Sequence, residues 1–363
     1  MGRIRLSIFL LALFVLLGAT GLGHAQGDMY VYFLDVGQAE STLLLGPGFT
    51  ILIDAGDWGK SDVIDHLQRL GVEKVDLFIV THPHADHIGQ AAAVLDSFSV
   101  AEVWMSGFEH TTLLFEKLLD ALLEGEADYL EPRTGEWVSY GELRLEVVNP
   151  ADIGTNLHAS NIVVRAVYGN VAFLFTGDAE RPSERDIIGT DLPLGAQILQ
   201  LGHHGSRTSS SLEFLLAVRP ELAIYSAGLD GPFGHPHQEV IDRLKILGIP
   251  VYGTEINGTI IARTDGHTYT IYAESGQDLV PTMRPSLQHL EEERRVELNS
   301  ASYAELQRIR HIGPARAQEI INLREILPFR SVDDLKWVAG LGAQKIEEIK
   351  EQGLAYVKGV SKD

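Results

Sequence analysis

The 363-residue chain contains no cysteine, which excludes disulfide bonds and any metal site built on thiolates. A lipid-modified cysteine behind a leader peptide is excluded for the same reason. The apolar run near the N-terminus extends only from Leu6 to Leu17, which is shorter than the roughly 20 residues needed to cross a bilayer. Histidine and carboxylate side chains are therefore the ligands that remain for a metal site.

Positive charge is scarce and unevenly placed. The chain carries 29 Lys and Arg residues against 50 Asp and Glu residues, a formal charge of −21. Residues 296–363 contain ten basic and ten acidic residues, so the first 295 residues carry the whole excess. We therefore expect a polyanion to be held first by the C-terminal part, unless metal ions offset the acidic field.

The first 25 residues have the features of a secretory signal peptide. Arg3 and Arg5 precede the apolar run, and small residues then lead to a Gly-His-Ala cleavage pattern before Gln26. Because the run is short, we expect cleavage and no stable membrane insertion. The mature protein is predicted to be secreted or periplasmic.

Length and polarity predict two domains in the mature chain, at residues 26–275 and 296–357, joined by a polar linker at 276–295. Strand-like and helix-like segments alternate through the first domain, which predicts an α/β fold. The expected strands are 30–34, 42–45, 50–53, 78–80, 143–148, 162–167, 171–175 and 196–201, with three more in 250–273. The expected helices are 61–70, 88–97, 111–123 and 238–247.

The densest chemistry lies in FIVTHPHADHIGQ, residues 78–90. Four side chains suited to metal, those of His82, His84, Asp86 and His87, follow directly on a buried strand. Imidazole and carboxylate suit zinc, manganese or iron, and this spacing can serve two adjacent ions. The alternative is a solvated histidine loop with no metal.

The run from Thr81 to His87 matches the signature of the metallo-β-lactamase superfamily. Segments 33–39, 52–56, 174–179 and 201–206 resemble further elements of that fold. In detail, residues 29–273 are similar to the hydrolase domain of the ComEC family of DNA-uptake proteins. The resemblance implies an αββα sandwich and a metal-dependent hydrolase.

The resemblance also implies a ligand set for two divalent ions, zinc or manganese. One ion would be held by His82 and His84, the other by Asp86, His87 and His204, with Asp178 between them. Whether His158 is a further ligand of the first ion stays open. ComEC-like domains often carry Asn and Ser at this place, and the nearby residues Asn156, Ser160 and Asn161 look similar.

Other polar residues are expected to support this site. We assign Asp86 and His235 to catalysis, the latter as a proton donor or a phosphate contact, because its charge changes near neutral pH. His237 is expected only to start a helix. The residues predicted to orient the ligands are Asp35, Asp54 and His203.

The C-terminal domain repeats one arrangement, in which a capped short helix leads through a glycine turn into a second helix. From residue 296 to about 357 it resembles the paired helix-hairpin-helix domain of the ComEA family. The resemblance implies a sequence-independent grip on duplex DNA, and no protein partner is identifiable. The residues expected at the phosphates are Gly313, Pro314, Arg316, Gly340, Gly342 and Lys345. The alternative is a protein-interaction module.

The favoured hypothesis is a secreted metal-dependent phosphodiesterase, a DNA nuclease with its own DNA-binding tail. A second hypothesis keeps the metal site but changes the substrate to a phosphorylcholine-type ester, a lactam or a thioester. A third is a DNA receptor without enzymatic activity. The residues of the pocket do not separate the first two hypotheses.

Overall fold

The computed structural model describes residues 27–154, 156–229, 231–274, 276–279 and 295–358. The chain divides into two compact units, one before residue 282 and one from it. The predicted signal peptide and most of the predicted linker lie outside the described residues. Leu279 is buried in the core of the first unit, so that core extends past residue 275. Among the described residues, no helix combines the length and the apolar character needed to cross a membrane.

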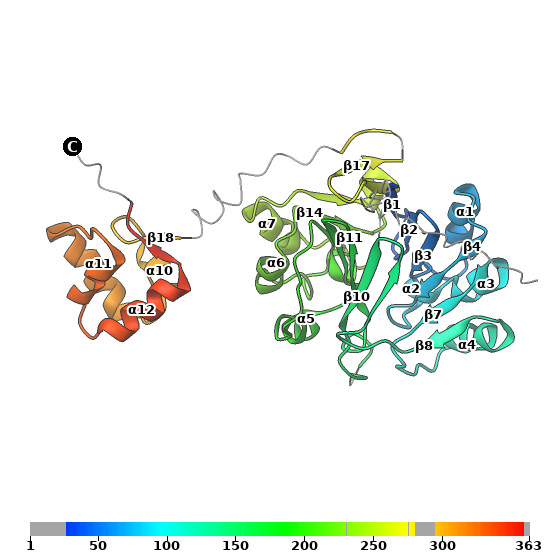
Figure 1. Ribbon diagram of the computed structural model, residues 1–363, viewed down its shortest axis with the longest axis horizontal. Coiled ribbons are helices and arrows are strands. Elements are labelled where there is room, and N and C mark those ends of the chain that lie inside the picture. The colour runs from blue at the N-terminus through cyan, green and yellow to red at the C-terminus, as the bar shows by residue number, and fades with distance from the viewer. Residues whose placement is uncertain (1–26, 155, 230, 275, 280–294, 359–363) are drawn as a thin grey trace, which may run out of the picture. The chain divides into compact units, whose positions relative to one another are not determined.

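The first unit contains two β-sheets packed face to face, with helices on both outer faces (Figure 1). The eight-stranded sheet has the order β17-β16-β1-β2-β3-β5-β7-β8. Its strands are β1 (Met29–Phe33), β2 (Thr42–Gly46), β3 (Phe49–Ile53), β5 (Leu77–Ile79), β7 (Glu102–Trp104), β8 (Asp128–Leu130), β16 (Ile260–Thr264) and β17 (Tyr269–Ala273). The strands β4 (Lys74–Val75) and β6 (Ser99–Val100) form a separate two-stranded parallel sheet.

The seven-stranded sheet has the order β15-β14-β13-β12-β11-β10-β9. Its strands are β9 (Trp137–Tyr140), β10 (Leu143–Asn149), β11 (Val163–Tyr168), β12 (Val171–Phe175), β13 (Ile198–Gln200), β14 (Leu222–Tyr225) and β15 (Val251–Gly253). The strands β9 to β12 are antiparallel, whereas β12 to β15 are parallel.

Side-chain alternation along the strands divides the apolar residues among three cores. In β3, Ile51 and Ile53 face the core between the sheets, while Leu52 faces the helices outside. The helices over the first sheet are α1 (Asp62–Arg69), α2 (Ala85–Ile88), α3 (Ala91–Ser97) and α4 (Leu113–Glu124). The second sheet is covered by α5 (Arg181–Ile188), α6 (Leu212–Val218) and α7 (Gln238–Ile246), and α8 (Thr254–Asn257) connects β15 to β16. The result is the expected αββα sandwich.

Parallel strands in both sheets end at the edge where the chemistry lies. β3 and β5 are parallel neighbours, and so are β12, β13 and β14. Asp54 follows β3, the histidine loop follows β5, and Asp178 follows β12. Because parallel strands carry their C-terminal ends to the same edge, polar residues distant in sequence meet there.

The second unit consists of short helices around its own apolar core. Its elements are β18 (Val296–Glu297), α10 (Tyr303–Leu306), α11 (Pro314–Ile326), η2 (Val332–Trp337), α12 (Ala343–Gln352) and β19 (Ala355–Tyr356). Capping boxes at Ser302 and Ser331 confirm the two predicted helix starts. The second of these helices is a 3-10 helix, and a two-residue parallel pairing of β18 with β19 closes the unit.

The element predictions hold for most of the chain. The hairpins β2–β3 and β11–β12 form as expected, and the helix starts and ends lie within a few residues of their predicted positions. The three strands expected in 250–273 are present but belong to different sheets, since β15 pairs with β14 while β16 and β17 join β1. Sequence periodicity defines a strand but not its neighbours.

Candidate metal centre

Asp54 is the buried residue that organises the histidine loop. It is fully buried and has a φ of 59°, in the left-handed region that residues other than glycine seldom adopt. Its carboxylate accepts hydrogen bonds from the backbone N–H of Thr81 at 2.8 Å, the hydroxyl of Thr81 at 2.7 Å and Nδ1 of His87 at 2.7 Å. Because Nδ1 donates to Asp54, Nε2 is the ring nitrogen of His87 that is left to face a metal.

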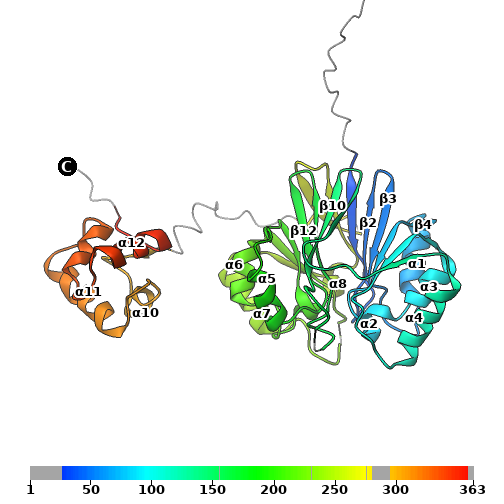
Figure 2. The same ribbon diagram turned by 60° about the horizontal axis from the view of Figure 1, so that its bottom comes forward.

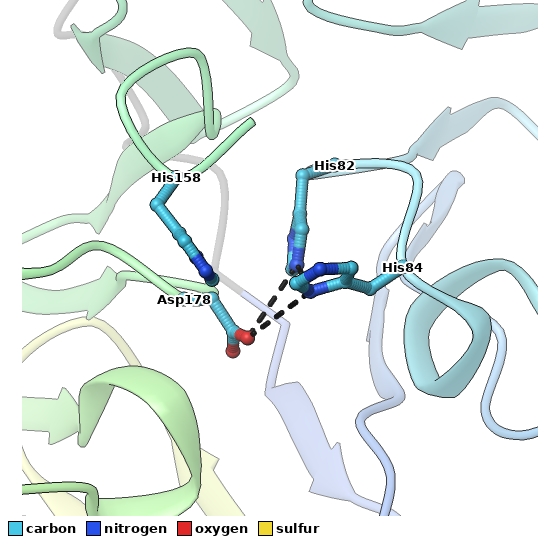
Figure 3. Close-up of side chains that lie close together, drawn as sticks. All are labelled: His82, His84, His158 and Asp178. Atoms are coloured by element: carbon cyan, nitrogen blue, oxygen red, sulfur yellow. Dashed lines mark hydrogen bonds and ion pairs between the residues drawn. The ribbon is translucent and has the colours of Figure 1, made fainter. Parts of the chain in front are cut away.

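His82, His84, His158 and Asp178 form the first cluster (Figure 3). Nε2 of His82 and Nδ1 of His84 lie 3.4 and 3.8 Å from Oδ2 of Asp178. His158 approaches from the side opposite the two loop histidines. One ligand atom from each of the four residues lies within 4.8 Å of the others, a spacing that one metal ion can bridge.

Asp86, His87 and His204 form the second cluster. Nε2 of His204 lies 3.2 Å from Oδ2 of Asp86, and Nδ1 of His204 donates to the carbonyl of Ser226 at 2.9 Å. Nε2 of His87 lies 3.2 Å from Oδ1 of Asp178. Asp178 thus turns Oδ2 toward the first cluster and Oδ1 toward the second, as a bridging carboxylate would.

The neighbouring histidines 203 and 204 both have left-handed backbone conformations, with φ of 51° and 55°. Their side chains consequently reach opposite oxygens of Asp178. Nε2 of His203 lies 3.5 Å from Oδ2, whereas Nε2 of His204 lies 3.9 Å from Oδ1. The structure thus brings His203, predicted only to support the loop, to the carboxylate itself.

A third group of ligand type shares one histidine with the first cluster. His158, Glu180 and His203 each present one atom within 4.8 Å of the others. Nδ1 of His203 lies 3.4 Å from Oε1 of Glu180. Sequence reasoning missed Glu180, which lies two residues after Asp178 in no recognised pattern.

Two hydrogen bonds made by the side chain of Asn161 fix the backbone at Asp178. Its Oδ1 accepts the backbone N–H of Asp178 at 3.0 Å, and its Nδ2 donates to the carbonyl of Thr176 at 2.7 Å. Ser160, which is also buried, accepts the N–H of Gly154 at 2.8 Å. Residues 160 and 161 thus hold the loop, while His158 faces the cluster.

Several buried polar atoms in these clusters have no hydrogen-bond partner among the described residues. They are Nε2 of His87, both carboxylate oxygens of Asp178, Nδ1 of His158 and Nδ1 of His203. Buried nitrogen and oxygen atoms are nearly always hydrogen-bonded, so this concentration needs a reason. Divalent metal ions supply one, because imidazole nitrogen and carboxylate oxygen are suitable ligands.

Burial and neighbouring charges set the protonation states of the ligands. Burial and then the neighbouring His87 lower the pKa of His82 to about 3. Burial by itself would raise the pKa of Asp178, but the charges of His87 and His82 hold it well below its ordinary value. Burial by itself would lower the pKa of His87, but the charges of Asp178 and Asp54 hold it well above its ordinary value, so a metal would displace a proton from this ring.

The prediction that Asp35 supports the site is wrong. Its side chain is exposed, and its carboxylate accepts a hydrogen bond from the backbone of Gly37 at 3.4 Å. Glu40 lies at the site instead. Its Oε1 accepts from the hydroxyl of Ser226 at 2.9 Å, and its Oε2 lies 4.0 Å from Nδ1 of His204. Burial raises the pKa of Glu40 to about 7.

His235 lies beside the second cluster. Its ring centre is 5.9 Å from that of His204 and 5.6 Å from that of His203. Nε2 of Gln38 lies 3.2 Å from Nδ1 of His235, so the amide donates to this nitrogen and the ring proton belongs on Nε2. Burial and then the nearby histidines lower the pKa of His235 to about 4, so, contrary to expectation, its charge does not change near neutral pH, and the ring donates there as a neutral N–H. His237 is the residue that precedes α7, as expected.

In the second unit, Gly313 and Gly342 occupy equivalent positions directly before α11 and α12. Both have ordinary φ values, and no atom lies within 4 Å of the place where a Cβ would stand. Neither helix start has a side-chain cap. Open amides at a helix start can receive an anion.

The basic side chains predicted to contact phosphate are engaged within the unit. Arg316 donates to the carbonyls of His311 at 2.7 Å and Ala339 at 3.1 Å, and so joins the two hairpins. Lys345 donates to the carbonyl of Gly340 at 3.0 Å. Gly340 has a φ of 76° and lies against the Arg316 guanidinium, so it shapes the turn.

Comparison with known families agrees with this geometry. Residues 34–228 match the model of the metallo-beta-lactamase superfamily. The chain belongs to this superfamily. Its first unit is a hydrolase of the metallo-β-lactamase fold, with a candidate histidine and aspartate site for divalent metal. Residues 291–352 match the helix-hairpin-helix motif, which confirms the second resemblance.

Relatives of this hydrolase include competence proteins. ComE operon protein 3 of Bacillus subtilis is 28% identical over 281 residues, which cover 73% of this chain and 36% of that protein. Competence protein ComA of Neisseria gonorrhoeae is 29% identical over 239 residues, 65% of this chain and 32% of that protein. A deoxyribonuclease of Thioalkalivibrio is 44% identical over 63 residues, 17% of each chain. The chain thus spans about a third of the length of the competence proteins that it matches.

Proposed function

We propose that this hydrolase is a phosphodiesterase that cuts DNA, with the first unit as the catalytic domain and residues 296–357 as a duplex-binding domain. The observation that carries the proposal is the position of Asp178. Its two oxygens face two separate ligand clusters in a chain that also carries paired helix-hairpin-helix motifs. The competence relatives and the partial match to a deoxyribonuclease support the same substrate class.

Two divalent ions, zinc or manganese, would occupy the clusters. His82, His84 and His158 would hold one, and Asp86, His87 and His204 the other, with Asp178 shared. Such a pair activates a water and stabilises the charge that develops on phosphate oxygens. His158 counts here as a ligand because it shares the first cluster.

Side chains around the proposed metal site hold the ligands in position and supply contacts for the substrate. Asp54 sets the tautomer of His87, and Asn161 fixes the backbone of Asp178. His235 is held by Gln38 with its Nε2 proton free, which suits a contact with a phosphate oxygen or a leaving group. Asp86 lies opposite His204 and is the carboxylate most open to solvent among the ligands, so it can also orient the attacking water.

The helix starts of the second unit would hold the duplex by its backbone. No atom crowds the Cα of Gly313 or Gly342 on the side where a Cβ would stand, so phosphate oxygens can approach the two helix starts closely. Arg316 and Lys345 would act mainly by shaping the turns, because both donate to turn carbonyls. Contacts of this kind position DNA without reading its sequence.

Export would place this activity outside the cytoplasm, in the periplasm or the medium. The proposed signal peptide, residues 1–25, would be removed on the way. N-terminal sequencing of the exported protein tests this, with Gln26 as the expected first residue. Recovery of a chain that retains Arg3 and Arg5 in the membrane fraction would contradict it.

The decisive experiment uses full-length protein loaded with zinc or manganese on linear duplex, single-stranded DNA and a chromogenic phosphodiester. We expect all three to be hydrolysed. Leucine at both Gly313 and Gly342 should raise KM on duplex while turnover of the small phosphodiester is unchanged, since only remote binding is lost. Cleavage of a phosphorylcholine ester, a lactam or a thioester, with DNA left intact, would show that the substrate is not nucleic acid.

A further inference from the structure

A pocket beside the metal centre gathers arginine side chains that the proposed chemistry does not use. It has a volume of about 450 Å³ and is lined by Arg181, Arg185, Ser211, Leu212, Glu213 and Arg243. These residues come from α5, the start of α6, and α7, which cover the same face of the seven-stranded sheet (Figure 2).

Positively charged side chains predominate in the lining of this pocket, although the unit that contains it has a net negative charge. Three guanidinium groups face one carboxylate, whereas the first 295 residues carry the whole net charge of −21. Glu184, a nearby acid, is buried, and its carboxylate accepts the backbone N–H of Ser211 at 2.9 Å. A local excess of positive charge inside a concave wall is what an anion requires.

Backbone carbonyls hold two of the arginines in place. Arg181 donates to the carbonyl of Arg207 at 3.0 Å, and Arg243 donates to the carbonyls of Ser209 and Ser210. Burial and then the charge of Arg181 lower the pKa of Arg243, whereas the carboxylates of Glu184, Glu213 and Glu239 act in the opposite direction. Like charges kept this close repel each other, and a bound anion would relieve the repulsion.

The pocket and the metal centre share the same two chain segments. Arg181 follows Asp178 by three residues, which span at most about 11 Å. The backbone N–H of Arg181 donates to the carbonyl of Thr208 at 3.0 Å, and the hydroxyl of Ser209 donates to the carbonyl of Ala179 at 2.7 Å. The loop that carries His204 therefore continues directly into the pocket wall.

We propose that this pocket binds a backbone phosphate of the DNA strand being cut, a few nucleotides from the scissile bond. Guanidinium groups suit the task because they bind phosphate oxygens in pairs. The inference rests on the proposed nuclease function. It adds the path that the cut DNA strand would follow over the catalytic unit.

The test replaces Arg181 and Arg185 together by glutamine in the full-length chain. Arg243 stays unchanged because its hydrogen bonds hold the loop between Ser209 and Ser210. The matched control is Lys117→Gln with Lys245→Gln, which removes the same charge from two exposed positions outside the pocket.

Turnover is measured on single-stranded oligothymidylates of increasing length. In the parent protein, kcat/KM should rise once the strand is long enough to reach the pocket. The arginine variant should lose that rise, with KM on the longer strands increased about tenfold or more and kcat on the dinucleotide unchanged. The salt dependence of KM should also fall by about 0.7 in log–log slope for each lost phosphate contact.

A second measurement does not need catalysis. Hydrogen exchange of residues 181–213 is followed in EDTA with and without a long oligothymidylate. Protection that is lost in the arginine variant and kept in the lysine control supports the pocket, even if no DNA is cut and the nuclease function fails. Unchanged KM on long strands together with unchanged exchange in this segment would overturn the proposal while leaving the nuclease function standing.

Discussion

Asp54 is fully buried, and its carboxylate accepts three hydrogen bonds. Asparagine at this position would replace one of the two acceptor oxygens by an amide nitrogen, which donates. The amide oxygen can still accept from the backbone of Thr81, but the amide nitrogen then faces the Thr81 hydroxyl and Nδ1 of His87. The hydroxyl can rotate and accept, whereas the imidazole N–H cannot. Either this buried donor stays unpaired, at a cost of about 1–3 kcal/mol, or the ring changes tautomer.

Both outcomes weaken metal binding. A changed tautomer places the proton on Nε2 of His87, which is the atom directed at Asp178. Loss of a partner that orients a ligand typically lowers metal affinity by about 10–100-fold. We therefore expect Asp54→Asn to bind zinc or manganese at least tenfold more weakly at the second cluster, as measured by calorimetric titration of metal-free protein.

The matched control is Asp35→Asn, because Asp35 also follows a strand but its carboxylate is exposed and accepts from the backbone of Gly37. This variant should bind metal like the parent protein. Circular dichroism of both variants checks that the fold is retained. If Asp54→Asn and Asp35→Asn bind metal equally well, the argument that Asp54 controls the tautomer of His87 is refuted.

Three further predictions follow from the same structure. Asp178→Ala should abolish hydrolysis and deplete both ions, whereas His158→Ala should weaken one ion, as metal analysis and turnover will show; equal losses would contradict this order. The pKa of Glu40 is raised to about 7 from 4.5, so ionisation costs the folded state stability as pH rises through this range. Glu40→Gln should therefore stabilise metal-free protein at pH 8 by up to about 3 kcal/mol and have little effect at pH 4, as thermal unfolding in EDTA will show; equal gains at both pH values would refute this. Gly340→Ala should destabilise the second unit by about 1–2 kcal/mol because φ is positive there, whereas Gly313→Ala should not; chemical denaturation compares the two, and equal stabilities would be the contrary result.

The local chemistry of the ligands could be read from the order of residues alone. The spacing of His82, His84, Asp86 and His87 after an apolar strand is a property of one short segment. The same holds for the glycine turns of the second unit, since a turn depends on its own few residues. The strand and helix pattern and the charge division also need no tertiary contacts, because they depend on composition and period.

Only the tertiary structure decided which distant residues meet. Asp35 and Asp54 both follow strands, yet one is exposed and the other holds the histidine loop. Glu40 and Glu180 carry no pattern, but strand pairing brings them to His204 and His203. Sheet order and backbone conformation determine which of these residues lie close together, and local periodicity predicts neither of them.

The sequence by itself thus determined the residue types of the metal centre, the α/β alternation and the paired hairpins, while the αββα layering was implied by the family resemblance. The tertiary structure decided that Asp178 faces two clusters, that His158 belongs to the first, and that Arg181 and Arg185 share a pocket with α7. The physical reason is that ligand chemistry resides in each side chain, whereas geometry arises when parallel strand ends from two sheets are brought to one edge by burial of the core between them.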